Sequence, residues 1–557
     1  MPADFLSRWT LETYESEFAG RHRLHDVPSY WAARQPDALA WINATRSTQW
    51  TWARFDAAAR AWAGALQARG FRKGDFLVTS LPLFDEHILL EYACFRLGVI
   101  HVPLDLRLAP PEALRCLSVV RAKGYAYLAG LLDPLAASVR ETLPFVEHIW
   151  AVAPGWSIEG PPADEPEILP TDCAQVIFTT GSTGTPKAAM LSHRGITCQN
   201  MGLGGAFRFG PTERVLVNLP ASHVGCQAEL LMTSFFCGAT AVTLEIFDAG
   251  LSLKAIEEHR VTLIGQIPAM FQLEWRHSSY AERDLSSIGA AVYGGQSVPP
   301  PFLGKMRTMS PLIGTGLGLT EASGFCTYTP LTGDVDTVSA SIGFAIPAYP
   351  MTIREPMTAD GNAGAELPAG TIGHVCFRGP QTFLGYVNDA EATARTLSRD
   401  GYLYTGDLGA MTGDGLRFAG RAKWVIKPAG NQVFPGDVED HFAALTGEVA
   451  SVGIVGHEHQ LWSEAIVAFI EPKPGAELTE AALRKHARGL TSYMRPLHYV
   501  LVEPGQMPLN RVAKIDTRRL QEMARAEVAK LRERGRWDAG RPGAGGPDAD
   551  GPGEMTS

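Results

Sequence analysis

The chain lacks several features that would place it in a specialised class of protein. Its eight cysteines, among 557 residues, form no C-x-x-C pair, which argues against a zinc motif or a disulfide framework and is typical of reduced thiols. No apolar run reaches the roughly 18–20 residues of a membrane-spanning helix. The N-terminal sequence MPADFLSRWTLETYESEF has no hydrophobic signal core. These absences predict a cytoplasmic protein.

Positive charge is also scarce. The chain has 49 Lys and Arg against 59 Asp and Glu, and its net charge of −10 gives no general attraction to nucleic acid or to an anionic membrane. A polyanionic substrate must therefore be held by local positive charge. The hydrophobic content of 45% is that of an ordinary globular protein. The length predicts roughly three or four domain-sized units.

Helical and strand-like patterns alternate over residues 28–130 and again over residues 174–330. In the first stretch, helical spacing over Phe55–Gln67 and Glu86–Leu97 flanks the strand-like run Phe76–Leu81. Such alternation is typical of parallel sheets with helices on both faces. It predicts two doubly wound α/β lobes.

The pattern of apolar and turn residues changes after residue 340. Short strand-like runs separated by turns predict a small β-rich unit, and a smaller α+β module follows. We predict an N-terminal domain over residues 1–422, a small C-terminal domain over 423–530 and a disordered tail over 531–557. The tail is rich in Gly, Pro and Asp and offers little to bury.

The run TTGSTGTPK, Thr179–Lys187, follows the apolar stretch Ala174–Phe178. Glycines let backbone N–H groups approach an anion, hydroxyls donate to phosphate oxygens and the lysine adds charge. The run predicts a phosphate-binding loop. It does not fit the Walker A pattern, because Pro186 and Ala188 replace the required Gly and Ser/Thr. The candidate binding residues of the loop are Thr179, Thr180, Gly181, Ser182, Thr183, Gly184, Thr185 and Lys187.

Four later segments carry chemistry of the same kind. In GTGLGLTEAS, Thr320 offers a hydroxyl for phosphate and Glu321 a carboxylate for Mg²⁺, which prefers oxygen ligands. Asp407 in YLYTGDLG can accept two hydrogen bonds from vicinal hydroxyls. The run GRAKWVIKPAGNQVFPGDVE is cationic and glycine-rich, and Lys514 ends the polar segment PLNRVAK. Each segment alone is equally typical of a turn, a solvated face or a surface lysine.

The order of all five segments makes the chain resemble the adenylate-forming superfamily, which includes acyl-CoA synthetases, nonribosomal adenylation domains and firefly-type luciferases. The resemblance covers about residues 28–525. It implies an N-terminal AMP-binding adenylation domain and a mobile C-terminal domain. It also implies ATP, Mg²⁺ and coenzyme A as cofactors.

The resemblance implies a role for each matching residue. The loop would handle the β- and γ-phosphates of ATP, Thr320 would contact the α-phosphate and Glu321 would hold Mg²⁺. Asp407 would take the ribose hydroxyls, with Arg421 nearby on ribose or phosphate. Lys514 would bridge the substrate carboxylate and the α-phosphate, where an ammonium group offsets the charge of the transition state.

Other matching positions concern the second half-reaction and the adenine. Lys423 would be the hinge of the C-terminal domain, and Gly430 would belong to a loop that approaches the pantetheine tunnel. His223, in LPASHVG, would gate between the acyl pocket and this tunnel, although a histidine here is also typical of a protein core. Gly316 and Leu317 would lie at the nucleotide, and Leu317 replaces the usual aromatic residue that stacks on adenine.

Two further departures from the family pattern replace common glycines. Ala429 lies in the C-terminal loop, and Ala513 precedes Lys514. Neither replacement, nor Leu317, removes a charged catalytic group. We therefore expect an active enzyme.

The leading prediction is a free-standing carboxylate–CoA ligase, AMP-forming, that makes an acyl-adenylate and transfers the acyl group to CoA. Residues after 530 leave no room for a fused carrier module. The alternative is a free-standing adenylation enzyme that loads a separate carrier protein. A non-catalytic nucleotide sensor would have lost Lys514 or Glu321, and both are present.

The sequence predicts the acid only broadly. The matching pocket positions are His223–Gly225, Tyr293–Gln296, Gly314–Leu317 and Phe325. They contain no Asp or Glu to pair an amino group, which disfavours an amino acid. Glycines at 294, 295, 314 and 316 would leave space, and Tyr293 and Gln296 could bind a hydroxyl. Small-to-medium aliphatic, hydroxylated and aromatic acids all fit, and no residue requires the homodimer that is common in the family.

Overall fold

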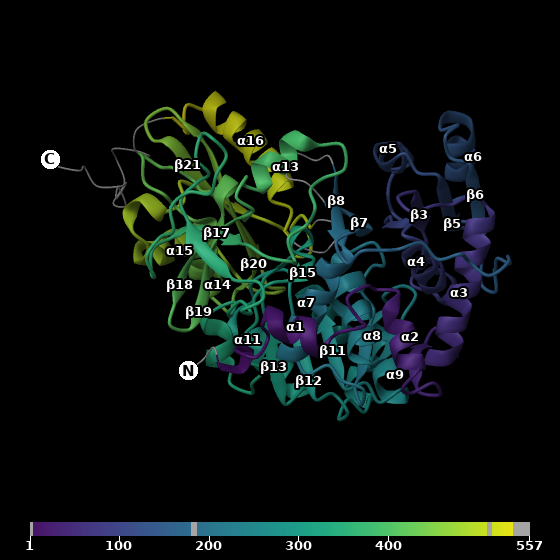
Figure 1. The fold of residues 1–557 in the computed structure, drawn as a ribbon. Helices are drawn as coiled ribbons and strands as arrows, with labels where there is room; N and C mark the ends of the chain where they lie inside the picture. Colours follow the sequence, from purple (N-terminus) through teal and green to yellow (C-terminus); the bar gives the residue numbers. More distant parts are fainter. Residues whose placement is uncertain (1–3, 180–185, 510–514, 539–557) are drawn as a thin grey trace. The chain divides into compact units, whose positions relative to one another are not determined.

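The computed structural model describes residues 4–179, 186–509 and 515–538, which form a mixed α/β chain (Figure 1). The chain divides into two compact units. Unit 1 comprises Met1–Pro368, Cys376–Thr405 and Met411–Leu416, and unit 2 comprises Ala369–Val375, Gly406–Ala410 and Arg417–Ser557. No helix within the described ranges is both long and apolar enough to cross a membrane.

Unit 1 contains a seven-stranded sheet in the order β13-β12-β11-β9-β10-β1-β2. All neighbouring strands are parallel except β1 and β2, which are antiparallel. The short β14 (Gly318–Leu319) and β15 (Gly324–Phe325) form an antiparallel pair after β13. The seven strands are β1 (Leu39–Asn43), β2 (Thr48–Thr51), β9 (Arg214–Val217), β10 (Thr240–Thr243), β11 (Leu263–Gln266), β12 (Ala290–Tyr293) and β13 (Leu312–Thr315).

A second sheet of unit 1 has six strands in the order β6-β5-β3-β4-β7-β8. Only β7 and β8 are antiparallel. The two parallel sheets with helices between their strands confirm the predicted α/β lobes, and their central strands are largely buried, as is typical when helices cover both faces of a sheet. The six strands are β3 (Phe76–Ser80), β4 (Ile100–Pro103), β5 (Gly124–Leu128), β6 (His148–Val152), β7 (Cys173–Thr179) and β8 (Lys187–Ser192).

The helices of unit 1 follow the apolar spacing of the sequence. In α3, Phe55, Ala59, Trp62 and Leu66 are buried, and Thr51 caps the helix by accepting a hydrogen bond from the Arg54 N–H. The helices are α1 (Leu11–Glu17), α2 (Asp26–Ala32), α3 (Trp52–Ala68), α4 (Asp85–Leu97), α5 (Pro110–Val120), α6 (Asp133–Thr142), α7 (His193–Ala206), α8 (Thr233–Cys237), α9 (Ala249–Glu258), α10 (Pro268–Arg276), α11 (Pro300–Met309), α12 (Val335–Ala340) and α13 (Ala390–Thr396). Short helical turns are η1 (Asp4–Leu6), η3 (Tyr280–Glu282) and η4 (Thr320–Ala322), and η2 (Gly225–Met232) is π-helical.

Four strands follow in the chain, β16 (Met351–Arg354), β17 (Gly373–Phe377), β18 (Leu403–Thr412) and β19 (Gly415–Arg421). The division between the units falls within β17, β18 and β19. Unit 2 continues with η5 (Ala422–Trp424), α14 (Pro435–Ala443), β20 (Val449–His459), β21 (Ser463–Pro472), α15 (Glu480–His486), η6 (Ala487–Gly489), η7 (Ser492–Met494), β22 (His498–Leu501) and α16 (Thr517–Glu533). In this unit β20, β21 and β22 form one sheet.

Order continues past residue 531, where the sequence predicted the tail to begin. Helix α16 runs to Glu533, and Trp537 is buried against the core that contains Leu520 and Val528. The Trp537 indole N–H donates to the Glu458 carbonyl at 2.8 Å. Residues 539–557 of the predicted tail lie outside the described residues.

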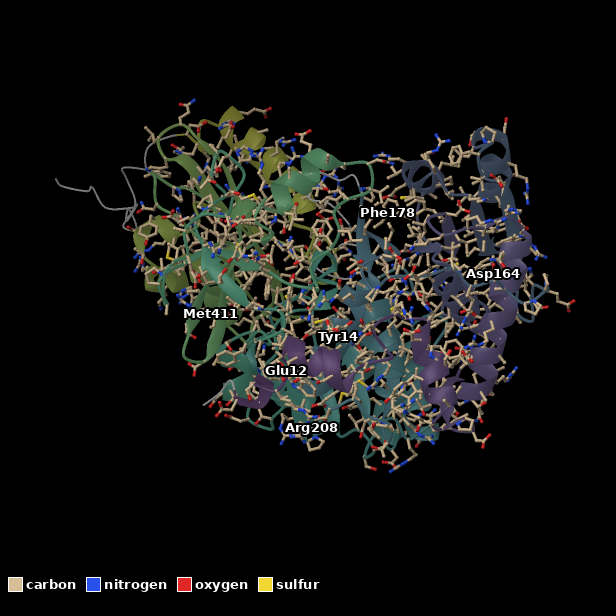
Figure 2. The ribbon with its side chains drawn as sticks, in the orientation of Figure 1. Glu12, Tyr14, Asp164, Phe178, Arg208 and Met411 are labelled. Carbon is tan, nitrogen blue, oxygen red and sulfur yellow. The ribbon has the colours of Figure 1, made fainter. Side chains whose placement is uncertain are left out.

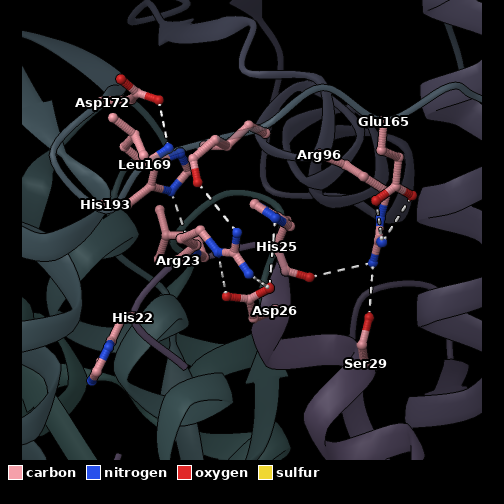
Figure 3. Close-up of polar contacts among 12 residues, drawn as sticks. His22, Arg23, His25, Asp26, Ser29, Arg96, Glu165, Leu169, Asp172 and His193 are labelled. Carbon is pink, nitrogen blue, oxygen red and sulfur yellow. Dashed lines mark hydrogen bonds and ion pairs between the residues drawn. The ribbon is translucent and has the colours of Figure 1, made fainter. Parts of the chain in front are cut away.

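The N-terminal segment is tied to the body of unit 1 by polar contacts (Figure 3). Arg96 of α4, with a side chain only 3% exposed, donates to the His25 carbonyl at 3.3 Å and to Glu165 at 3.1 Å. At the start of α7, His193 Nδ1 accepts from the Leu24 N–H at 3.2 Å, and burial lowers the pKa of His193 to about 3. Tyr14, labelled in Figure 2, is also buried and hydrogen-bonded to Thr197 of α7. These contacts hold the N-terminal segment against α4 and α7.

A fully buried hydrogen-bond chain lies between α4, β3 and β4. Burial raises the pKa of Glu91 to about 8 and lowers that of His87 to about 4 and of His101 to about 3, so all three are neutral near pH 7. The Pro82 carbonyl can only accept, so His87 Nδ1–H donates to it at 3.1 Å. Thr79 then donates to His87 Nε2 at 2.9 Å and accepts from His101 Nε2–H at 2.9 Å. His101 Nδ1 lies 3.2 Å from the Glu91 carboxyl group and accepts a hydrogen bond from its O–H.

This chain predicts a stability maximum near neutral pH. The two histidines bind fewer protons in the folded than in the unfolded protein, so their contribution is lost as pH falls below about 6.5. Folded Glu91 keeps a proton that the unfolded chain loses, so its contribution is lost as pH rises toward 8. We expect Glu91→Gln to reduce the fall in unfolding midpoint between pH 6.5 and 8, measured by urea denaturation. An unchanged pH slope in this variant, relative to the exposed control Glu258→Gln, would contradict the protonated Glu91.

Candidate active site

The predicted phosphate loop connects β7 to β8. Thr179 at the end of β7 is the register partner of Lys187 at the start of β8, and its hydroxyl donates to the Lys187 carbonyl at 3.5 Å. The two ends of the loop therefore lie side by side. Residues 180–185, the rest of the predicted loop, lie outside the described residues, so phosphate binding stays a prediction.

The Thr320–Glu321 pair lies in a single tight turn, η4. Ser323 closes this turn with a left-handed backbone (φ 58°), and its N–H donates to the Thr320 carbonyl at 2.9 Å. Thr320 is buried, and Glu321 is partly exposed. The Glu321 carbonyl accepts from the Phe383 N–H at 2.9 Å, which fixes the turn against the segment that precedes α13.

Tyr386, which the sequence analysis did not identify, links the loop to this turn. Its hydroxyl donates to Glu321 Oε1 at 2.6 Å, and Lys187 Nζ lies 5.0 Å from the centre of its ring. Residues 384–387 pair with β8, since Ala189 and Tyr386 form an antiparallel bridge. Burial and the negative charge of Glu321 raise the pKa of the Tyr386 phenol, so it stays a donor.

The residues around Glu321 fit Mg²⁺. One carboxylate oxygen is oriented by Tyr386, and the other is the atom that would hold the ion. Mg²⁺ usually takes one or two protein carboxylates and completes its shell with phosphate oxygens and water. The described residues contain no cluster of three or more His, Cys, Asp and Glu that could hold a metal ion.

We expect Tyr386→Phe to raise the Mg²⁺ concentration for half-maximal pyrophosphate release about three- to tenfold, because it removes one hydrogen bond to a charged group. The measurement is initial rate against free Mg²⁺ at saturating ATP. Tyr402→Phe is the matched control, since its hydroxyl accepts from Arg354 at 3.0 Å in the same unit. An equal rise of the half-maximal Mg²⁺ concentration in both variants would show that Tyr386 has no specific role at the Mg²⁺ site.

His223 lies in the turn between β9 and η2. Its side chain is exposed, and Nδ1 accepts from the Gly225 N–H at 3.1 Å. Its carbonyl accepts the N–H groups of Cys226 and Gln227, which begin η2. The structure therefore places His223 at the surface of unit 1 rather than in its core. Its gating role stays a prediction.

The glycines predicted to leave space for the acyl group serve this chain's own packing. A Cβ at Gly314 would lie 2.8 Å from the Phe207 ring, and one at Gly294 would lie 3.1 Å from Phe325. A Cβ at Gly316 would clash with the Thr327 carbonyl. Tyr293, only 5% exposed, packs in the core of the seven-stranded sheet. The expectation that these glycines leave space for the acid, and that Tyr293 offers it a hydroxyl, stays a prediction.

Leu317 is held mainly by its backbone. Its N–H donates to the Thr327 hydroxyl at 2.8 Å, and its carbonyl accepts from the Cys326 N–H at 2.8 Å. Its side chain is partly exposed. This arrangement leaves an apolar side chain at the position where the resemblance implies adenine, and adenine contact stays a prediction.

In unit 2, Asp407 of β18 and Arg421 of β19 form an ion pair. Arg421 Nε lies 2.7 Å from Asp407 Oδ1, and the two side chains are 51% and 2% exposed respectively. Gly406 (φ 79°) precedes the aspartate and Gly420 (φ 119°) precedes the arginine, backbone angles that favour glycine. The resemblance implies that Arg421 lies near Asp407, and the structure places the two in contact; their roles at ribose or phosphate stay predictions.

Two of the residues predicted to act in the second half-reaction, Lys423 and Gly430, also lie in unit 2. Lys423 Nζ lies 4.5 Å from the centre of the Trp424 ring, next to the end of β19. Ala429 (φ 48°) and Gly430 (φ 83°) form the tip of a hairpin closed by the Ile426–Val433 bridge. Ala429 therefore has the left-handed backbone that glycine adopts most readily. Lys514 and Ala513 lie outside the described residues.

Comparison of the sequence with known proteins points to one family. The chain matches the family model described as AMP-binding enzyme over residues 29–387, and the AMP-binding enzyme C-terminal domain over residues 437–514. It is 29% identical over 461 residues to the feruloyl-CoA synthase of an Amycolatopsis species, covering 80% of this chain and 89% of that protein. It is 28% identical over 451 residues to the indoleacetate–CoA ligase of Aromatoleum aromaticum, covering 78% and 86%.

Solved structures share the fold. The anthranilate CoA ligase AuaEII, solved with anthranoyl-AMP, superposes with a TM-score of 0.81 at 22% identity, covering 92% of this chain and 99% of that one. The predicted fold class is confirmed. The first family match alone spans residues 29–387 of 557, more than half of the sequence, and the chain belongs to the AMP-binding enzyme family.

Proposed function

We propose that this chain activates an aromatic carboxylic acid in the cytoplasm. The chain is an AMP-forming acid–thiol ligase: the acid attacks the α-phosphate of ATP, releases pyrophosphate and gives an acyl-adenylate. The thiol of CoA then displaces AMP and forms the thioester. The aromatic acid is supported by the two relatives described above, which are named for feruloyl-CoA and indoleacetate.

The observation that carries the adenylation step is the arrangement of Lys187, Tyr386 and Glu321. It brings a cation at the end of the predicted phosphate loop and an oriented carboxylate to one phenol, with Lys187 over the ring and Glu321 at the hydroxyl. These charges suit a phosphate chain with its Mg²⁺. No covalent enzyme intermediate is required, because positioning and charge neutralisation supply most of the rate.

The test is ATP- and Mg²⁺-dependent pyrophosphate release with cinnamate, 4-hydroxycinnamate, benzoate, indoleacetate and hexanoate, each with and without CoA. We expect release with at least one aromatic acid, acceleration by CoA and an acyl-CoA product identified by mass. Release that ignores CoA would favour the loading of a separate carrier protein. Hexanoate as the best acid would overturn the aromatic assignment.

A homodimer and the cytoplasmic location stay predictions.

A further inference from the structure

The left-handed backbone of Ala429 is held by the turn between β20 and β21, which lies in the same unit. A positive φ, here 48°, is unfavourable for a residue with a Cβ and persists only where its surroundings fix it. The Ala429 N–H donates to the Trp462 carbonyl at 2.7 Å. Next to it, Pro428 forms an antiparallel bridge with Ser463. The loop of Ala429 and Gly430 therefore takes its shape from this turn.

His459, the last residue of β20, fixes the backbone of the turn. It is 3% exposed, and its Nδ1 accepts the N–H groups of Leu461 at 3.1 Å and of Trp462 at 3.3 Å. Its ring stacks on the Trp462 ring, with centres 4.3 Å apart. A ring nitrogen that accepts hydrogen bonds carries no proton, so the proton of the neutral ring is on Nε2. Burial lowers the pKa of His459, which keeps the ring neutral near pH 7.

The end of the described chain orients the His459 ring. The Trp537 carbonyl can only accept, and His459 Nε2–H donates to it at 2.9 Å. The buried Trp537 ring lies edge-on to the His459 ring, with centres 5.7 Å apart. A continuous series of hydrogen bonds therefore connects Trp537, His459, Trp462 and Ala429.

The loop at the end of this series is open to solvent. Ala429 and Gly430 are both exposed, and no heavy atom of the described residues lies within 4 Å of a Cβ built at Gly430. The resemblance implies that Gly430 belongs to a loop that approaches the pantetheine tunnel. A loop that positions a reacting group must keep its shape, because small displacements of reacting atoms cost rate.

We infer that His459 is a positioning residue for thioester formation, because it holds the loop of Ala429 and Gly430 in the shape that receives the thiol of CoA. The inference rests on the proposed ligase function. In this step the CoA sulfur bonds to the acyl carbonyl carbon, the bond from that carbon to the AMP phosphate oxygen breaks, and the thiol proton passes to water. His459 is buried and acts through the loop, so formation of the acyl-adenylate should not depend on it.

The test measures the two half-reactions separately in two variants. His459→Phe keeps a ring against Trp462 but loses both nitrogens, so kcat/KM for CoA with supplied acyl-adenylate should fall about tenfold. Its pyrophosphate release without CoA should stay within about twofold of the wild type, since only the second step uses the loop. His459→Asn places an acceptor oxygen near the position of Nδ1, so its kcat/KM for CoA should stay within about threefold of the wild type.

His441→Phe is the matched control. His441 Nε2 lies 3.0 Å from the His486 carbonyl, so this variant loses a similar hydrogen bond between α14 and the end of α15 in the same unit. Its thioester formation should equal that of the wild type. Equal losses of thioester formation in His441→Phe and His459→Phe would assign both residues to the stability of unit 2 and overturn the inference. Unchanged CoA kinetics in His459→Phe would overturn it as well.

Hydrogen–deuterium exchange separates this inference from the ligase assignment. Exchange in the peptide of residues 426–433 is measured by mass spectrometry in the full-length protein without ligands. The Ala429 N–H should exchange at least about tenfold faster in His459→Phe and near the wild-type rate in His459→Asn. Faster exchange in His459→Phe supports the hold of His459 on the loop even if CoA is not the acceptor. Equal exchange in the wild type and His459→Phe would overturn the inference, whatever thiol the enzyme uses.

Discussion

Lys514→Ala is expected to lower the rate of acyl-adenylate formation by roughly 10²–10³-fold, because it removes the ammonium group that offsets charge between two reacting anions. The C-terminal family match extends to residue 514, and the segment PLNRVAK gives the family's late lysine its position in the chain. The measurement is the rate of pyrophosphate release at saturating ATP and acid.

The same variant should keep thioester formation from a supplied acyl-adenylate, because this second half-reaction does not require the carboxylate and the α-phosphate to be joined. Lys530→Ala is the matched control, a lysine of α16 that lies 2.7 Å from Glu527 on an exposed surface. Equal losses in both half-reactions would show that Lys514 supports the structure and does not act in adenylation.

Asp407→Ala is expected to lower kcat/KM for ATP by about 10- to 100-fold while leaving the KM for the acid nearly unchanged. The side chain is 2% exposed and can accept hydrogen bonds from two ribose hydroxyls, each stronger because the acceptor is charged. The fold should survive, because Arg421 is half exposed and water can solvate it when its partner is lost.

Initial rates against ATP concentration measure this effect. Asp414→Ala is the matched control, since Asp414 is exposed in the turn between β18 and β19. Its ATP kinetics should equal those of the wild type. ATP kinetics unchanged in Asp407→Ala as well would assign the Asp407–Arg421 pair to the stability of the hairpin.

The sequence predicted the regular elements well where apolar spacing decides them. The helix expected over Phe55–Gln67 is α3, and the strand expected over Ala174–Phe178 is the centre of β7. The helical segment η2 (Gly225–Met232), however, is π-helical. Spacing could not show this, because a wider turn depends on tertiary contacts that the local pattern does not contain.

The candidate site was predictable only where a side chain belongs to a local run. Asp407 and Arg421 were expected to lie near each other, since each belongs to a recognisable segment, and they form an ion pair. Tyr386 was missed because it follows Glu321 by a long stretch of chain and reaches it only through pairing with β8. The role of the pocket glycines could not be predicted from the sequence alone, because a missing Cβ does not reveal whether the free space serves a ligand or a neighbouring ring.

The buried chain from Glu91 to Pro82 has a consequence for engineering this protein. Each hydrogen bond of the chain is donated in the same direction, so a single replacement removes the bonds of that residue and leaves its buried neighbours without those partners. Single-site libraries at these positions should therefore show uniform intolerance. Simultaneous replacement of these side chains together with Gln175, which donates to Glu91 Oε1 at 2.7 Å, by apolar side chains of equal volume should be better tolerated, because fewer buried polar groups are then left without partners. The residues of this buried chain therefore have to be replaced together rather than one at a time.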